Sequence, residues 1–140
     1  MSNSSSRLAT RYFIDLTQPE IAAQFKKNPL VILPAGSVEQ HGPHLPTGTD
    51  IYAANVIGHA VAERMDGLVL PGGPLGVTPM HMPFEGTITL TPDTYQRVVT
   101  ETCASTAQHG AKRLLILNWH EGNIPSLAIA SEKLHREVGM

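Results

Sequence analysis

The sequence predicts an α/β domain in which helices cover both faces of a mostly parallel sheet, giving three layers. Two observations lead to this fold class. Short runs that are apolar on every residue alternate with longer segments whose apolar residues recur at helical spacing. Their order is helix, strand, helix, strand, loop, helix, strand, helix, which right-handed crossovers between parallel strands produce. Ligands of such sheets collect beyond the carboxyl ends of the strands, where both histidine-rich loops of this chain lie.

The composition is that of one globular domain and argues against several classes of protein. Hydrophobic residues make up 41% of the 140 residues and charged residues 16%, an ordinary balance for a buried core. A formal net charge of -2 without a basic run disfavours nucleic-acid and anionic-membrane partners. No apolar run approaches the roughly 18 residues that span a bilayer. With the single Cys103, which excludes an internal disulfide, these features predict a cytoplasmic protein.

The first elements are a helix and a strand. Residues 1–16 are polar at the start and lack the apolar core of a secretory signal, so we expect a loose segment ahead of a single unit over residues 17–140. Thr17, followed closely by a proline, is typical of a helix N-cap and predicts a helix over residues 17–27. The apolar residues 30–33 then predict a buried strand.

A long loop and a second helix follow this strand. The loop covers residues 34–50, and Asp50 at its end can cap the next helix. Apolar residues at helical spacing predict that helix over residues 51–65. Asp66 and Gly67 close it.

The rest of the chain repeats the alternation of strand and helix. Residues 68–71 predict a second short strand, and the Gly- and Pro-rich residues 72–90 form a loop long enough to indicate a functional role. A threonine cap followed by proline predicts a helix over residues 91–109. Residues 114–117 predict a third buried strand, and a last helix is expected over residues 125–138.

The first loop carries candidate metal ligands at the end of a buried strand. Glu39, His41, His44 and Asp50 fall within twelve positions. Carboxylate oxygens mixed with imidazole nitrogens suit Zn²⁺, Mn²⁺ or Fe²⁺, and the absence of thiolates favours an open, catalytic type of site. Glu39 and His41 are two residues apart, so an extended loop would direct both toward one pocket. His44 fits a ligand or a hydrogen-bond partner of a ligand equally well.

The third predicted strand ends in a second set of polar residues, His120 and Glu121. If the first and third strands are parallel, these residues lie at the same edge of the sheet as the first loop. Convergence from two strand ends is what a metal site requires. Alternatively, His120 only forms hydrogen bonds with backbone groups. Glu121 could be a metal ligand, a proton carrier or a polar neighbour without a role.

The remaining reactive side chains are predicted to have structural roles. His59, His109 and His135 lie on helices or at a helix end, where packing, the helix carbonyl groups or solvent account for them. Cys103 lies inside a predicted helix without a basic residue one turn away, which predicts an inert buried thiol. Ser37 lacks the GxSxG setting of a nucleophilic serine.

Three segments together resemble the creatininase (creatinine amidohydrolase) family: LPAGSVEQHGPHLPTGTD, GVTPMHMPFEGTITL and LILNWHEGN. The family shows a GS-x-EQHG-P-HLP-x-GTD loop, an F-P-G-T segment and an N-G-H-G-G-N strand end, in this order. The resemblance runs from about residue 30 to the end of the chain. It implies the family's α/β fold and metal ligands at Glu39, His41, Asp50 and His120, with Asp50 bridging two divalent metals.

The third segment departs from the family pattern. Trp119 and Glu121 stand where the family usually has glycines on either side of the histidine. Creatininase itself has a ligand glutamate two residues after this histidine, a position that is Gly122 here. In the loop before it, Met80 replaces an acid ahead of His81, and Glu85 follows Phe84 where the family has proline.

These features predict a metal-dependent hydrolase of a carbon–nitrogen bond in a small, cyclic or formamide-like amide. His120 and Glu121 are the predicted catalytic residues. The residues predicted to bind the substrate are Trp119, His81 and Glu85. Family members are longer, so this chain would be the amino-terminal part of a creatininase-like domain, incomplete at its carboxyl-terminal side. By resemblance we expect a homo-oligomer. One alternative is a family member with non-hydrolytic or peptide-directed chemistry at the same metals. The other is a metal-binding or structural subunit that needs a second polypeptide for activity.

Overall fold

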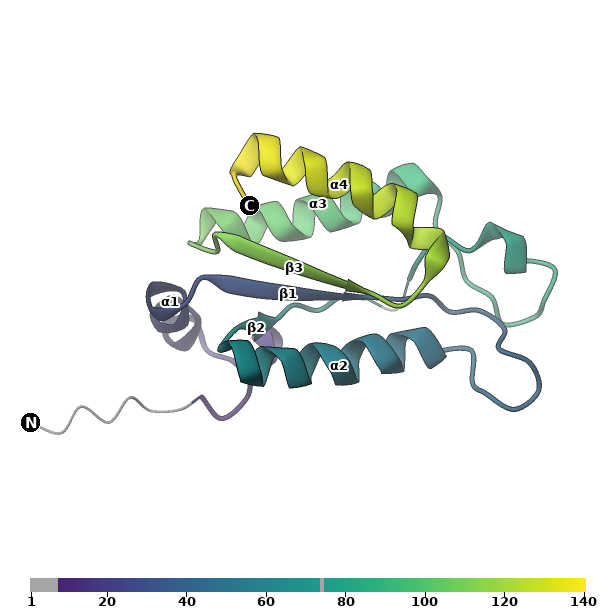
Figure 1. Cartoon of the computed structure of the whole chain (residues 1–140), viewed down its shortest axis with the longest axis horizontal. Helices are drawn as coiled ribbons and strands as arrows, with labels where there is room; N and C mark the ends of the chain where they lie inside the picture. The colour runs from purple at the N-terminus through teal and green to yellow at the C-terminus, as the bar shows by residue number, and fades with distance from the viewer. Residues whose placement is uncertain (1–7, 74) are drawn as a thin grey trace, which may run out of the picture.

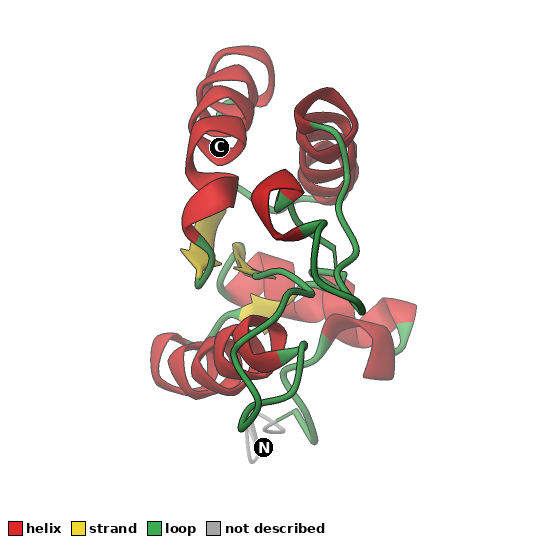
Figure 2. Cartoon of the chain, turned by 90° about the vertical axis from the view of Figure 1, so that its right-hand side faces the viewer, coloured by secondary structure: helices red, strands yellow, loops and turns green. Residues whose placement is uncertain are grey.

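The computed structural model describes residues 8–73 and 75–140 and contains a three-stranded parallel sheet in the order β2-β1-β3. Helix α2 covers one face of the sheet, and α3 and α4 cover the other (Figure 1). The view along the sheet shows the strands between these two helical layers (Figure 2). The predicted three-layer α/β class with a parallel sheet is therefore confirmed.

Strand β1 (Leu30–Ala35) lies at the centre of the sheet, and all its residues are buried. It pairs in parallel with β2 (Leu68–Val69) on one side and with β3 (Arg113–Asn118) along its whole length on the other. The prediction that residues 114–117 form a buried strand was wrong about burial, because all four of these residues are only partly buried. Among the described residues β3 pairs with β1 alone, so the edge position leaves one side uncovered.

Helix α2 (Thr49–Met65) packs on the sheet through small side chains. Ala54, Gly58 and Ala62 are buried along one face of the helix. A Cβ atom at position 58 would lie 3.1 Å from Cγ of Pro34 in β1, so the missing side chain lets the helix approach the strand closely. The helix ends at Asp66, which has the left-handed conformation (φ 55°) typical of a helix C-terminus.

Helices α3 (Pro92–Gln108) and α4 (Ile124–Val138) pack against each other and against the opposite face of the sheet. Thr91 caps α3 by accepting a hydrogen bond from the backbone of Thr94. The core between these helices and the sheet is built from apolar residues of β1, of the segment after β2 and of both helices: Val31, Leu33, Ala35, Leu70, Tyr95, Val99, Cys103, Leu127, Ala130 and Leu134.

The amino-terminal helix α1 (Gln18–Lys27) begins with the predicted cap, because the backbone of Thr17 donates to Glu20 (2.8 Å). Residues 8–16 do not form the loose segment that the sequence predicts. The short 3-10 helix η1 (Phe13–Asp15) follows Tyr12, which pairs with Val69 of β2. A buried arginine in the same segment, Arg11, ion-pairs with Asp66. Residues 1–7 of that segment lie outside the described residues.

The two loops expected to form the site lie against each other at the carboxyl edge of the sheet. Val38 of the first loop forms a bridge with Ile88 of the second, and within the second loop Gly76 forms one with Thr89. The second loop contains a short 3-10 helix, η2 (Pro79–His81), and the third strand leads into another, η3 (Glu121–Asn123). In the described part of the chain, no helix combines the length and the apolar character that a bilayer crossing requires.

Candidate metal centre

The carboxylates of Glu39 and Asp50 meet the imidazole of His120 beyond the ends of β1 and β3. One ligand atom from each lies within 4.8 Å of the others, and all three residues are buried. Nδ1 of His120 is 3.3 Å from Oε2 of Glu39 and 3.4 Å from Oδ2 of Asp50. Two donor atoms on one tetrahedral zinc, each at roughly 2.0–2.1 Å, are about 3.3 Å apart. These separations therefore suit a shared cation.

The hydrogen bonds of His120 determine which of its ring nitrogens faces the carboxylates. Nε2 lies 3.0 Å from the carbonyl oxygen of Val77, which can only accept, so Nε2 carries the proton. A neutral ring then presents the lone pair of Nδ1 to Glu39 and Asp50. Three electron-rich atoms facing one another in a buried site need a positive charge among them, either a metal ion or a second proton on the ring.

His41 repeats this arrangement on the other side of Asp50. Its Nδ1 lies 3.1 Å from the carbonyl oxygen of Glu39 and so carries the proton, which leaves Nε2 facing Oδ1 of Asp50 at 3.1 Å. Asp50 thus presents one oxygen to each histidine. The structure therefore brings His41 next to Asp50, whereas the group of candidate ligands found among the described residues consists of Glu39, Asp50 and His120.

Two buried hydroxyl groups orient the carboxylates. Ser37 donates to Oδ2 of Asp50 (3.0 Å), and Thr78 donates to Oε2 of Glu39 (2.6 Å). The sequence analysis considered Ser37 only as a nucleophile and did not single out Thr78. Ser37 lies in the GS-x-EQHG pattern, but the carboxylates that the two hydroxyl groups bind are 13 and 39 residues away, so these partners follow only from the folded structure.

The same contacts keep Glu39 ionised at neutral pH. Burial by itself raises the pKa of the Glu39 carboxyl. The hydrogen bond from Thr78 lowers this pKa, as does the charge that His120 carries when its ring holds a second proton, and together they bring it below its usual range. Glu39 is therefore available as an anionic ligand.

Asp50 is held by the first turn of α2 and does not cap it, which corrects the prediction from sequence. The N-cap position is Gly48, and Asp50 lies inside the helix with its side chain directed to the cluster. A close approach of the strand end supports this position. A Cβ atom at position 36 would lie 2.8 Å from the carbonyl carbon of Asp50, so only Gly36 fits there.

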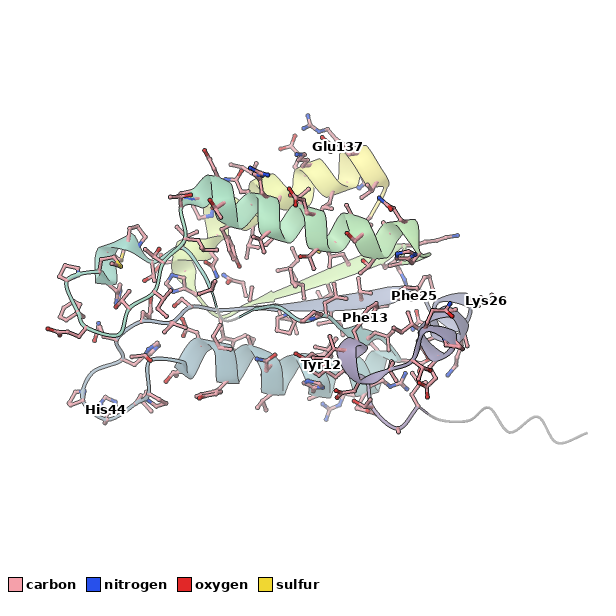
Figure 3. The ribbon with its side chains drawn as sticks, turned by 180° about the vertical axis from the view of Figure 1, so that it is seen from behind. Tyr12, Phe13, Phe25, Lys26, His44 and Glu137 are labelled. Atoms are coloured by element: carbon pink, nitrogen blue, oxygen red, sulfur yellow. The ribbon has the colours of Figure 1, made fainter. Side chains whose placement is uncertain are left out.

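The other predicted site residues surround the cluster without joining it. Nδ1 of His81 lies 3.3 Å from the amide nitrogen of Gln40, near enough to Glu39 for its charge to affect that carboxyl. Glu85 is exposed on the same loop. His44 is exposed at the tip of the loop between β1 and α2 (Figure 3) and lies outside the group of candidate ligands found among the described residues.

Trp119 and Glu121 are exposed on either side of His120. Together with His120, Asn118 and Ile124 they line a shallow, open pocket of about 330 Å³. Glu121 is not part of the group of candidate ligands in the described residues. Position 122 offers no alternative, because a Cβ atom there would lie 2.3 Å from the carbonyl oxygen of Val77. A side chain at Gly122 would thus displace the carbonyl that holds His120.

Several known proteins are similar to this chain. The family described as creatininase, creatinine amidohydrolase, matches residues 14–140. The chain belongs to the creatininase family. A mycofactocin precursor peptide peptidase of Mycobacterium ulcerans (strain Agy99) is 37% identical over 118 residues, covering 78% of this chain and 47% of that protein. A creatinine amidohydrolase of Pseudomonas putida is 33% identical over 115 residues, covering 78% of this chain and 44% of that protein.

Solved creatininases share the fold of this family member. A crystal structure of creatinine amidohydrolase superposes with a TM-score of 0.87 at 29% identity, covering 93% of this chain and 52% of that one. Two further creatininase structures, one described as Zn–Zn type and one as Mn, have TM-scores of 0.86 and 0.82 at the same identity, and this chain covers 53% and 55% of them. The chain spans about half the length of the curated relatives it matches.

Proposed function

We propose that this chain carries the metal centre of a hydrolase that cleaves a carbon–nitrogen bond of an amide. The observation that carries the proposal is the pairing of Asp50 with two histidines. Each histidine donates one ring N–H to a backbone carbonyl and directs its other nitrogen at a different oxygen of Asp50. Histidine ligands of metals are commonly oriented in this way by a hydrogen bond from the second nitrogen.

The ligands would be Glu39, His41, Asp50 and His120, with Asp50 serving two divalent cations. The donor set consists of two carboxylates and two imidazoles without a thiolate, which suits zinc, manganese or iron. Zinc and manganese are supported by two solved creatininases, one described as Zn–Zn type and one as Mn. Bound there, the cations would supply a water of lowered pKa and a polarised substrate carbonyl.

The protein's own residues would orient the ligands and the substrate. Ser37 and Thr78 hold the carboxylates in place through their hydroxyl groups. Glu121, exposed in the pocket beside His120, is the candidate for carrying a proton to the departing nitrogen. Trp119 offers a flat apolar wall in the same pocket, and His81 and Glu85 extend the polar surface along the adjoining loop.

The substrate is proposed to be a small amide, cyclic or formamide-like, and a peptide is the second candidate. The name of the relative from Pseudomonas putida supports the first, and the name of the relative from Mycobacterium ulcerans supports the second. One observation on this chain favours the peptide. The pocket at Trp119 is open, and Met80, Met82 and Phe84 on the adjoining loop expose apolar side chains that could contact an extended chain.

Hydrolysis assays on the natural protein test both parts of the proposal. Creatinine, formamides and short peptides would be compared before and after chelation and after return of zinc or manganese. Loss of hydrolysis on chelation and its recovery with metal are expected. An active preparation free of metal would contradict the proposal. The substrate that is turned over decides between the two substrate classes.

The alternative function is a metal-binding or structural subunit that depends on a second polypeptide. Mass analysis of the natural protein would show whether a different chain copurifies and whether activity requires it. We propose instead a homo-oligomer in the cytoplasm, for which a single mass and a multiple of it in solution are the expected results.

A further inference from the structure

Asn123 lies at the end of η3, directly before α4, and its side chain is fully buried. Every polar atom of its amide group has a partner. Oδ1 accepts from the backbone N–H of Val77 (2.8 Å), and Nδ2 donates to the carbonyl oxygen of Gly36 (2.9 Å) and to Oδ1 of Asn118 (3.2 Å). A single side chain thus joins the end of β1, the end of β3 and the loop of residues 72–90.

Two of the three hydrogen-bond partners of Asn123, Gly36 and Val77, directly precede a residue whose hydroxyl group donates to a carboxylate of the cluster. Gly36 precedes Ser37, which donates to Asp50, and Val77 precedes Thr78, which donates to Glu39. Asn123 therefore ties together the two backbone segments from which the carboxylates receive their hydroxyl hydrogen bonds.

The histidine of the cluster depends on the same side chain. The carbonyl oxygen of Val77, whose own N–H is held by Asn123, accepts the Nε2 proton of His120 (3.0 Å). Oδ1 of Asn118, which accepts from Asn123, also accepts from the backbone N–H of His120 (3.3 Å). The ring and the backbone of His120 are thus both one hydrogen bond away from a partner of Asn123.

We infer that Asn123 is a positioning residue that fixes the orientation and proton position of His120 through the carbonyl of Val77. The inference rests on the proposed metal centre.

Two glycines allow the backbone segments that Asn123 joins to approach one another closely. A Cβ atom at position 76 would lie 2.4 Å from the oxygen of Gly36 and 2.8 Å from Oδ1 of Asn123, and one at position 122 would lie 2.5 Å from Nε2 of His120.

Only a carboxamide satisfies the three partners. Val77 offers a donor, whereas Gly36 and Asn118 offer acceptors, so one oxygen and one NH₂ group are needed. Asn123→Asp keeps the shape and the acceptor for Val77 but sets an oxygen against two other oxygens. Asn123→Ala removes all three bonds and leaves the Val77 N–H without its partner in a buried site.

The test uses the protein expressed from its natural reading frame, with two readouts for each variant. The first is the ring Nε2–H signal of His120 in ¹H–¹⁵N NMR spectra of the metal-free protein, assigned by its loss in His120→Gln. Burial and the bond to Val77 should make this proton slow to exchange. The second is the affinity for zinc, measured by competition with a chelator. Gln24→Ala is the matched control, because it removes a buried amide that donates to the carbonyl of Asp66, remote from the cluster.

In Asn123→Ala we expect the His120 signal to disappear through exchange with water and zinc affinity to fall roughly 10- to 100-fold. Gln24→Ala should lower the denaturation midpoint and leave both readouts unchanged. A folded Asn123→Ala protein that retains both the protected signal and the zinc affinity of the wild type would overturn the inference. If Asn123→Ala does not fold, Asn123→Asp decides by the same two readouts.

The two readouts also separate this inference from the proposed function. A wild-type protein that binds no zinc, while Asn123→Ala still abolishes the protected signal, would overturn the metal centre and leave the positioning of His120 standing. If the wild type binds zinc and neither Asn123 variant changes the His120 signal or the zinc affinity, the positioning role of Asn123 is overturned and the metal centre stands.

Discussion

Oδ1 of Asp50 lies 3.1 Å from Nε2 of His41, the ring nitrogen that does not face a carbonyl oxygen. The second oxygen of Asp50 faces Nδ1 of His120 in the same manner, at 3.4 Å. A carboxylate flanked by two imidazole lone pairs lacks protons to share between them. A positive charge on each side of Asp50, either a metal ion or a second proton on the ring, would complete the arrangement.

Replacement of Asp50 by alanine should release metal and abolish hydrolysis together. Loss of this carboxylate leaves both cations short of a ligand and of compensating charge in a buried site. Elemental analysis after dialysis, alongside the activity, checks the expectation. Asp15→Ala, which removes an exposed acid far from the site, is the control. Metal content equal to the wild type in Asp50→Ala would contradict the assignment.

Replacement of Thr78 by valine should weaken zinc binding roughly 10- to 100-fold, because it removes the hydrogen bond to Oε2 of Glu39 while keeping the shape. Thr78→Ser retains the hydroxyl and should bind zinc nearly as well as the wild type. Chelator competition measures both constants. Equal affinities in the two variants would show that the hydroxyl has no part in orienting Glu39.

Replacement of Glu121 by glutamine should leave metal content unchanged, since its carboxylate is exposed outside the cluster. If Glu121 carries the proton to the departing nitrogen, turnover should fall roughly 10²- to 10⁴-fold. Metal analysis and turnover on the same preparation separate these effects. Loss of metal would make Glu121 a ligand, and unchanged turnover would require another proton carrier.

Replacement of Asp66 by asparagine should lower the free energy of unfolding at pH 7 by about 1 kcal/mol. Asp66 pairs with Lys27 (3.0 Å) and the buried Arg11 (2.7 Å). Burial alone would raise the pKa of Asp66, but these two cations prevail and lower it. Asparagine also tolerates the left-handed backbone at this position.

The effect of Asp66→Asn should depend on pH. Because the folded pKa is below the unfolded one, the stabilisation is present above the unfolded pKa and is lost as the pH falls through the lowered folded value. Urea unfolding at pH 7 and at a pH below that folded value should show a difference between wild type and variant only at the higher pH. A difference of the same size at both would assign the effect to packing.

Cys103 should resist alkylation in the native protein at pH 8. It lies on the buried face of α3, and burial raises the pKa of its thiol to about 12. Iodoacetamide should modify it only after unfolding in denaturant, as mass spectrometry would show. Rapid modification of the folded protein would contradict the predicted inert role.

The amino-acid order was sufficient for the fold class and for the edge of the sheet that bears the site. Apolar runs with no polar side mark strands buried by helices on both faces, and helical periodicity with local caps marks the segments between them. Parallel pairing of β1 and β3 then brings Glu39 and Asp50 to the same edge as His120. These conclusions depend on spacing along the chain, which is readable directly.

The contacts that hold the site could not be read in this way. Thr78 binds a carboxylate 39 residues away, and Asn123 binds the carbonyl of a residue 87 positions earlier. The partial exposure of β3 likewise depends on its place at the edge of the sheet. Local propensity and periodicity describe neighbours along the chain, whereas hydrogen bonds between distant loops exist only once packing has brought those loops together.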